Sequence, residues 1–144
     1  LLNRGSYDKI ICRYKRDRES FALILVDVDA FKKVNDSYGH LEGDRVLKRV
    51  ADLLKNAFRS EDYVCRIGGD EFVVIMHSMT EDKRQVIKRK IEAINFELKN
   101  LTDETFGVSI SAGIAFYDQK SDQKDIYKEA DDALYAVKKH RHCD

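Results

Sequence analysis

The chain has 144 residues, of which 43% are hydrophobic and 36% are charged, as is typical of one globular domain with its own core. Lysine plus arginine and aspartate plus glutamate number 26 each, so the net charge gives no reason to expect a nucleic-acid or membrane partner. No apolar run approaches the roughly 20 residues that span a bilayer, and the sequence shows no signal-peptide pattern. We therefore expect a cytoplasmic domain that contacts neither nucleic acid nor membrane.

The three cysteines, Cys12, Cys65 and Cys143, are an odd number without the spacing of metal ligands. Free thiols in a reducing compartment are the simplest interpretation. The chain begins at Leu1 rather than at methionine and contains no proline. We expect residues 1–144 to form a single domain cut from a longer multidomain protein, for example the cytoplasmic part of a larger sensor.

Hydrophobic periodicity divides the chain into helices and strands. The predicted elements are, in chain order, a helix around 7–14, a strand over 21–28, a helix over 46–58, strands over 62–67 and 71–77, a helix over 86–98 with Thr80 as its cap, a strand over 108–116 and a helix over 126–137. Between the outer helices this order is βαββαβ, the ferredoxin-like split βαβ pattern. We therefore predict an α+β fold: an antiparallel sheet covered by helices, with extra helices at both ends of the chain.

Four acidic residues stand at two strand ends that this topology brings together. Asp27 and Asp29 close the first strand, which is otherwise apolar, and Asp70 and Glu71 open the third strand. Because the first and third strands are antiparallel neighbours in the ferredoxin-like order, we expect these carboxylates to converge on one edge of the sheet. An acidic turn and a solvated strand end would be the usual interpretation of such residues. Asp27, however, lies within an otherwise apolar strand, and an unpaired buried carboxylate costs several kcal/mol. A functional site is therefore the better interpretation.

Converging carboxylates repel one another unless a cation neutralises them. Oxygen ligands without histidine or cysteine favour Mg²⁺ or Mn²⁺, and such ions in proteins commonly serve phosphate substrates. The segment after Asp29, Ala30-Phe31-Lys32, leads from strand into helix, where backbone N–H groups and Lys32 can bind phosphate oxygens. Gly68 and Gly69 suit a turn that needs positive φ or the close approach of another molecule.

The motifs together resemble the GGDEF domains of diguanylate cyclases over nearly the whole chain. Residues 68–72 (GGDEF) are the name-giving motif, and the other matching segments are 2–4 (LNR), 27–36 (DVDAFKKVND), 38–44 (YGHLEGD), 109–115 (SISAGIA) and 130–135 (ADDALY). The resemblance implies the nucleotidyl-cyclase or palm-like version of the ferredoxin-like fold. It also implies a homodimer in which each domain holds one GTP, and the products are cyclic di-GMP and two pyrophosphates. Two Mg²⁺ or Mn²⁺ ions per site are implied as cofactors.

The resemblance also assigns roles to residues. The implied metal ligands are Asp27, the carbonyl of Val28 and Asp70, and Glu71 is either a further ligand or the group that helps to deprotonate the attacking hydroxyl. The implied substrate contacts are Ala30, Phe31, Lys32, Asn35, His40, Asp44, Gly68, Gly69, Lys138 and Arg141, of which Asn35 and Asp44 read the guanine. Considered singly, these side chains have ordinary alternatives. Asn35 and Asp44 can cap a nearby helix, His40 can be a surface histidine, and Lys32 and Lys138 can be solvated helix charges.

Two further segments bear on regulation and on substrate contact. Arg59 and Asp62 form an Arg-x-x-Asp sequence five residues before Gly68, which matches the family's inhibitory site for the product. Arginine grips phosphate or guanine edges bidentately, and aspartate accepts hydrogen bonds from guanine. The alternative is a charge pair at a helix end. The family's closing Lys-x-x-Gly-Arg-Asn has Arg141 and His142 in place of its Gly and Arg, which puts that phosphate contact in doubt.

Three functions remain open from the sequence. The first is an active diguanylate cyclase, and the intact acidic turn favours it. The second is a catalytically weak domain that keeps the fold and binds cyclic di-GMP through Arg59 and Asp62. The third is a related cyclase that uses ATP or both nucleotides, which Asp44 disfavours because adenine lacks the donors of guanine.

Overall fold

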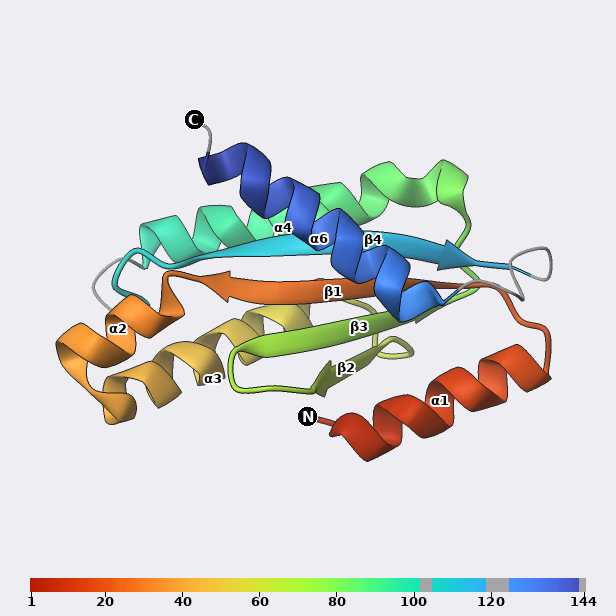
Figure 1. Ribbon diagram of the computed structural model, residues 1–144, viewed down its shortest axis with the longest axis horizontal. Coiled ribbons are helices and arrows are strands. Elements are labelled where there is room, and N and C mark those ends of the chain that lie inside the picture. Colours follow the sequence, from red (N-terminus) through yellow and green to blue (C-terminus); the bar gives the residue numbers. More distant parts are fainter. Residues whose placement is uncertain (102–104, 119–124, 143–144) are drawn as a thin grey trace.

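The sheet is built around β1 (Phe21–Asp29), whose first six residues are all apolar and fully buried. The computed structural model describes residues 1–101, 105–118 and 125–142 (Figure 1). The other elements are α1 (Arg4–Arg16), α2 (Phe31–Tyr38), α3 (His40–Ala57), β2 (Tyr63–Arg66), β3 (Glu71–His77), the 3₁₀ helix η1 (Glu81–Lys83), α4 (Arg84–Asn100), β4 (Ser109–Tyr117) and α6 (Ile126–His142).

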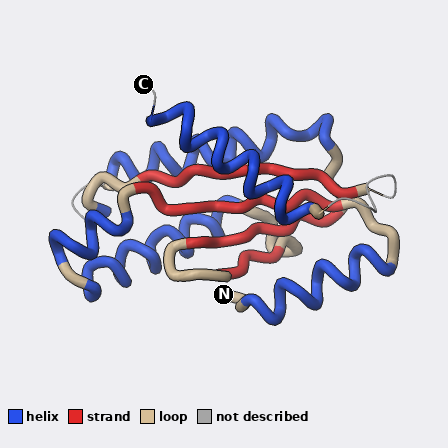
Figure 2. The backbone as a smooth tube through the Cα atoms, in the orientation of Figure 1, coloured by secondary structure: helices blue, strands red, loops and turns tan. Residues whose placement is uncertain are grey.

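Four strands form one antiparallel sheet in the order β2-β3-β1-β4 (Figure 2). This is the strand order of the ferredoxin-like fold, so the predicted fold class is confirmed. The predicted strand over 21–28 extends one residue further, and the strand predicted over 62–67 is limited to β2. Thr80 precedes η1 rather than α4, and its side chain makes no capping hydrogen bond to the helix. The predicted cap is therefore wrong, because the hydroxyl donates to Asp82 instead.

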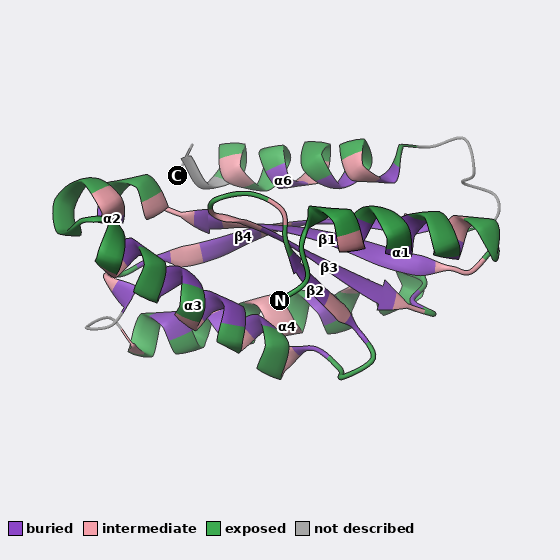
Figure 3. Ribbon diagram, turned by 90° about the horizontal axis from the view of Figure 1, so that it is seen from below, coloured by how far each residue is buried: buried purple, intermediate pink, exposed green. Residues whose placement is uncertain are grey.

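Helices cover both faces of the sheet and enclose two apolar cores (Figure 3). Ala22, Ile24 and Val26 face α3 and α4, whereas Leu23 and Leu25 face α1 and α6. Burial on both faces explains why β1 is a continuous apolar run rather than an alternating one. Because side chains alternate along a strand, Asp27 lies on the face that α1 and α6 cover.

Cys12 and Cys65 are free thiols, as predicted. Cys12 is an exposed free thiol and Cys65 is a buried one, whereas Cys143 lies outside the described residues. Burial raises the pKa of Cys65 to about 11, so its thiol stays protonated near neutral pH. None of the described helices has the length and apolarity that a membrane crossing needs.

Close approach of α6 to the sheet depends on Gly113 in β4. A Cβ at this position would collide with the carbonyl oxygen of Ala130 and the backbone nitrogen of Leu134, and it would lie 2.8 Å from the Leu134 Cβ. These backbone atoms belong to α6, so they cannot move without the whole helix. Gly113 therefore provides space rather than an unusual backbone conformation.

We expect Gly113→Ala to destabilise the domain by about 1–3 kcal/mol, the usual cost of overpacking a core. Chemical denaturation measures this difference, provided that the unfolding free energy of both proteins depends on denaturant concentration with the same slope. Gly5→Ala in α1 is the matched control, because the nearest atom to its Cβ is Asn3 Oδ1 at 3.4 Å. Equal stability of Gly113→Ala and the wild type would contradict this packing of α6.

Candidate active site at the ends of the central strands

The register of β1 and β3 brings the two acidic strand ends together. Asp27 pairs directly with Glu71, and the Val28 N–H donates to the Asp70 carbonyl at 3.2 Å. The convergence of Asp27 with the acidic hairpin is therefore confirmed. Both strand ends open toward α2 and the β2–β3 loop, at the edge where β1 ends in Figure 1.

Asp27 has a charge partner on α6. Its side chain is 19% exposed and forms an ion pair with the ammonium of Lys138, which is 33% exposed. A mostly buried carboxylate without a partner would be costly. The Lys138 ammonium supplies the positive charge that balances the Asp27 carboxylate. Lys138 therefore belongs to the acidic edge and is not a solvated helix charge.

Glu71 is held by a residue that the sequence analysis did not single out. The hydroxyl of Tyr127, in the first turn of α6, donates to Glu71 Oε1 at 2.7 Å. Burial first, and then the hydrogen bond to Glu71, raise the pKa of the Tyr127 phenol. The phenol therefore keeps its proton and acts as the donor. No sequence signal marks Tyr127, because the contact depends on how α6 crosses the sheet.

Asp29 differs from Asp27 in its partners. It pairs in register with Ser109, and it accepts hydrogen bonds from Ser109 Oγ at 2.8 Å and from Ser111 Oγ at 2.8 Å. Asp29 lies at the end of β1 that was predicted, but these hydrogen bonds go to β4 rather than to the acidic hairpin. The hydroxyls of Ser109 and Ser111 hold the Asp29 carboxylate on the β4 side of β1, whereas the acidic hairpin belongs to β3 on the other side.

The β2–β3 loop is held by the residue that precedes it. Arg66 donates from Nε to the Gly68 carbonyl at 3.2 Å and from Nη2 to the Gly69 carbonyl at 2.7 Å. Neither glycine has a φ in the left-handed region, so the expectation of positive φ is wrong. Four residues between the strands allow the chain to reverse without it. Both glycines are exposed, and a Cβ on Gly69 would have no atom within 4 Å.

The β1–α2 junction carries the predicted phosphate contacts. Ala30 adopts φ 63° and ψ 16°, and no side chain caps the helix that starts at Phe31. Orphan N–H groups at such a helix start are suitable donors for an anion. Lys32 is exposed in the first turn. The junction follows Asp29 directly and therefore lies at the same end of β1 as the acidic edge.

Asn35 in α2 lies beside Gly43 of α3, the residue that precedes Asp44. Asn35 Oδ1 is buried and has no hydrogen-bond partner among the described residues. A Cβ on Gly43 would overlap that amide, so this glycine makes room for it. Asp44 follows Gly43 and is exposed, as is His40 at the start of α3. The capping alternative for Asn35 and Asp44 is wrong, because Gly39 is the N-cap residue and no side chain caps α3.

An unpaired buried amide oxygen is costly unless a ligand supplies a donor. Asn35 is therefore the clearest sign of a polar ligand in this part of the chain. Lys138 differs from Asn35, because its ammonium is already paired with Asp27. The backbone of Arg141 lies in α6, but its side chain lies outside the described residues.

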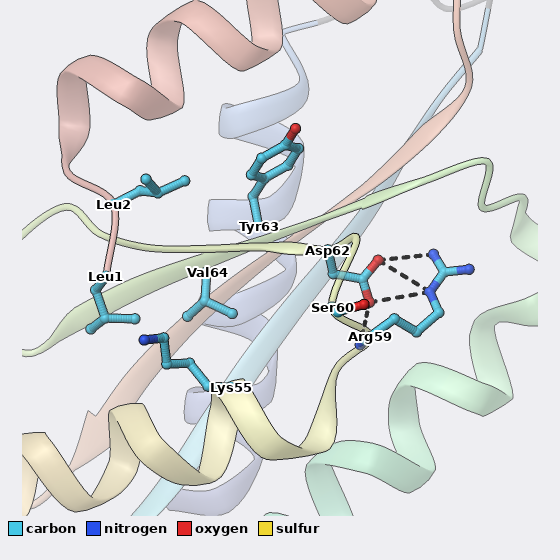
Figure 4. A pocket seen from close by; sticks show the side chains of 8 residues that line it. All are labelled: Leu1, Leu2, Lys55, Arg59, Ser60, Asp62, Tyr63 and Val64. Carbon is cyan, nitrogen blue, oxygen red and sulfur yellow. Dashed lines mark hydrogen bonds and ion pairs between the residues drawn. The ribbon is translucent and has the colours of Figure 1, made fainter.

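Arg59 and Asp62 form a separate pair between α3 and β2 (Figure 4). The Asp62 side chain has no exposed surface, and it accepts from the Arg59 backbone N–H at 2.8 Å and from Arg59 Nη2 at 2.9 Å. Arg59 Nη2 also donates to the His77 carbonyl at 3.1 Å. Glu71 begins β3 and His77 ends it, so this pair lies at the opposite end of β3 from the acidic edge.

The described side chains do not preassemble a metal site. Within residues 1–101, 105–118 and 125–142, no group of three or more histidine, cysteine, aspartate or glutamate side chains is placed to hold an ion. The carboxylates of Asp27 and Asp70 and the carbonyl of Val28 are nevertheless the hard oxygen donors that Mg²⁺ or Mn²⁺ prefers. This donor set fits a divalent ion that is also bound by water and by a phosphate ligand.

Comparison with known proteins agrees with this arrangement. The family described as "Diguanylate cyclase, GGDEF domain" matches residues 4–143. The chain is 38% identical over 133 residues to diguanylate cyclase DgcS of Shewanella oneidensis, a match that covers 92% of the chain and 44% of DgcS. The chain thus spans less than half the length of this relative.

Solved structures share the fold. The GGDEF domain of YfiN from Pseudomonas aeruginosa is 32% identical with a TM-score of 0.83, and the match covers 97% of this chain and 91% of that one. The GGDEF domain of DgcB from Caulobacter crescentus, in complex with c-di-GMP, is 27% identical with a TM-score of 0.82, covering 97% and 86% of the two chains. The chain belongs to the GGDEF family of diguanylate cyclase domains.

Proposed function

We propose that the chain is the catalytic domain of an active diguanylate cyclase, which condenses two GTP molecules into cyclic di-GMP and two pyrophosphates. The observation that carries the proposal is the acidic edge, where Asp27 lies opposite Glu71 and already binds a cationic group. DgcS, a relative of the chain, is a diguanylate cyclase, which supports the reaction class. The domain acts where GTP is available, which favours a cytoplasmic location.

The substrate is held by three groups of residues in this proposal. Asn35 and Asp44 accept hydrogen bonds from the N–H groups of guanine, and the buried Asn35 Oδ1 gains the donor that it lacks. The N-terminus of α2 and Lys32 bind the triphosphate. Lys138 reaches the same edge and adds a positive charge. Arg141 is a further candidate, and His40 supports the ribose or the loop.

Cyclases of this family are generally metal-dependent. Asp27, Asp70 and the Val28 carbonyl would hold the ions, with Glu71 as a further ligand or as the group that accepts the proton. Bound Mg²⁺ or Mn²⁺ lowers the pKa of the attacking hydroxyl and stabilises charge on the phosphate. The protein residues keep the carboxylates in place and orient the nucleotide.

The reaction requires two domains because each site binds one GTP. The 3′-oxygen of one nucleotide forms a bond to the α-phosphorus of the other, and the bond from that phosphorus to the bridging oxygen of pyrophosphate breaks. The proton of the 3′-hydroxyl leaves to a base at the edge or to water. The same step in the opposite direction closes the ring, so a homodimer with facing acidic edges completes the product.

We expect Asp70→Ala to reduce cyclic di-GMP formation at least about a hundredfold, because it removes a carboxylate that holds the ion. The backbone bond from Val28 to Asp70 remains, so the hairpin should stay folded. Product formation by the dimeric protein with GTP and Mg²⁺, resolved by mass, provides the measurement. Asp17→Ala, at the exposed end of α1, is the matched control. Wild-type turnover by Asp70→Ala would refute the site assignment.

We expect Gly43→Ala to raise the KM for GTP about five- to tenfold, because the new methyl group displaces the Asn35 amide that accepts from guanine. The change itself favours α3, since alanine is the better helix former. Steady-state kinetics with GTP and with inosine triphosphate, which lacks the 2-amino group, tests the assignment. The ratio of kcat/KM for GTP to that for inosine triphosphate should be smaller in the variant than in the wild type. An unchanged ratio would show that Asn35 does not contact the base.

The Arg59 pair is proposed to bind the product and inhibit turnover. The DgcB domain carries c-di-GMP in its crystal structure, which supports product binding within the family. In the present conformation the Asp62 side chain is buried and bonded to Arg59, whereas the Arg59 side chain is 39% exposed and its Nη1 forms an ion pair with the exposed Glu61. Arg59 therefore makes the contact to phosphate or guanine, and Asp62 orients it.

We expect Arg59→Ala to weaken product inhibition at least about tenfold, because a bidentate, charge-assisted contact is lost. Since this change also leaves Asp62 buried without its partner, Arg59→Lys is a second variant that keeps a cation but not the fork geometry. Initial rates at increasing cyclic di-GMP measure the effect. Unchanged inhibition in both folded variants would remove this assignment.

The rival function is a domain that binds cyclic di-GMP through Arg59 without making it. The two functions separate in one comparison of the dimeric protein. An enzyme turns over GTP, and Asp70→Ala stops turnover while product binding at Arg59 continues. A binding module binds cyclic di-GMP equally before and after the change and forms no product in either case.

A further inference from the structure

Tyr127 connects α6 to Glu71. Its hydroxyl donates to Oε1 of Glu71 at 2.7 Å, so one carboxylate oxygen is held from the helix side. The other oxygen lies on the side of the β2–β3 loop, where a Cβ on Gly68 would be 3.7 Å from it. The tyrosine therefore sets which oxygen of Glu71 faces the loop and which faces α6.

The ring of Tyr127 is itself held by α1. The guanidinium of Arg4 lies over it, with Cζ 5.6 Å from the ring centroid, and lies over the ring of Tyr7 at 5.9 Å. The two rings meet edge to face, with centroids 6.4 Å apart at 65°. Tyr7 is buried in the core that α1 and α6 share with the sheet. Arg4, Tyr7 and Tyr127 thus form a cluster, here called the Arg4 cluster, between α1 and the acidic edge.

Each of the two paired acids depends on α6 for its partner. Lys138 contacts Asp27, and Tyr127 contacts Glu71 from the other end of the same helix. The helix lies against β4 at Gly113, where its backbone leaves no room for a side chain. A rigid helix in contact at three places fixes both carboxylates together.

We propose that Tyr127 is a positioning residue, which orients the Glu71 carboxylate and makes that orientation depend on the packing of α1 through the Arg4 cluster. The inference rests on the proposed function only in so far as Glu71 serves the reaction. The contact itself is a structural claim that is tested without turnover. Its consequence is that a displacement of α1 relative to α6 changes catalysis without touching the nucleotide.

Tyr127→Phe removes the hydroxyl and keeps the ring under Arg4. We expect kcat to fall about tenfold while the KM for GTP changes less than about twofold, because a hydrogen bond to a charged group is lost but no substrate contact is. Tyr135→Phe is the matched control, since Tyr135 lies on the same helix and is 69% exposed. A loss of overall packing would not separate kcat from KM in this way.

Thermal unfolding tests the contact independently of activity. Tyr127→Phe should lower Tm by several degrees in the wild-type background and by less than about one degree in Glu71→Ala, where the acceptor is absent. Equal shifts in both backgrounds would overturn the inference. If the wild type makes no cyclic di-GMP but the shifts differ, the proposed function fails and the positioning of Glu71 by Tyr127 stands.

The role of α1 has its own test. Arg4→Gln removes the cation over both rings, and we expect kcat to fall about two- to fivefold, in line with the partly exposed cation–π contact to Tyr127. In the Tyr127→Phe background the same change should have no further effect on kcat, because the route to Glu71 is already broken. An undiminished effect of Arg4→Gln in that background would remove α1 from the inference.

Discussion

The antiparallel pairing of β1 with β3 is the constraint on which the candidate site depends. It places Asp27 opposite Glu71 because Leu25 lies opposite Val73, one step earlier on the same face. A slip of one residue would turn every side chain of β1 to the other face, so Asp27 would point into the core under α3 and α4. The apolar neighbours on both faces and the cost of burying Asp27 there therefore favour the observed register.

Neighbouring, partly buried carboxylates at this end of the sheet cost free energy, and contacts from α6 offset part of that cost. Lys138 neutralises Asp27, and Tyr127 donates to Glu71. Asp29 takes its partners from β4 instead. Three carboxylates on adjacent positions thus have three different environments, although all belong to the same end of the sheet. Carboxylates at one end of the sheet therefore acquire different chemistry from the elements packed against them.

Much of this arrangement follows from the sequence because it depends on short-range rules. Strand alternation and the βαββαβ order suffice to bring Asp27 to the acidic hairpin. The partners of the acids do not follow from these rules. Tyr127 reaches Glu71 only at the crossing angle that α6 adopts, and Asp29 meets Ser109 only in the observed register of β4. The absence of positive φ at Gly68 and Gly69 could not be predicted for a similar reason, because loop length decides whether a turn needs positive φ.

The contact between Lys138 and Asp27 links α6 to whatever cation binds at the acidic edge. An ion that takes the Asp27 carboxylate as a ligand competes with the ammonium for it, so its apparent affinity includes the free energy of releasing Lys138. By linkage, any change that loosens α6 also weakens this competition and alters the ion affinity. The helix is held close to the sheet at Gly113, and its first turn contacts α1 through Tyr127. Helix packing and ion binding at the acidic edge are therefore coupled. The packing of α1 against α6 changes the ion affinity of this site, although α1 does not contact it.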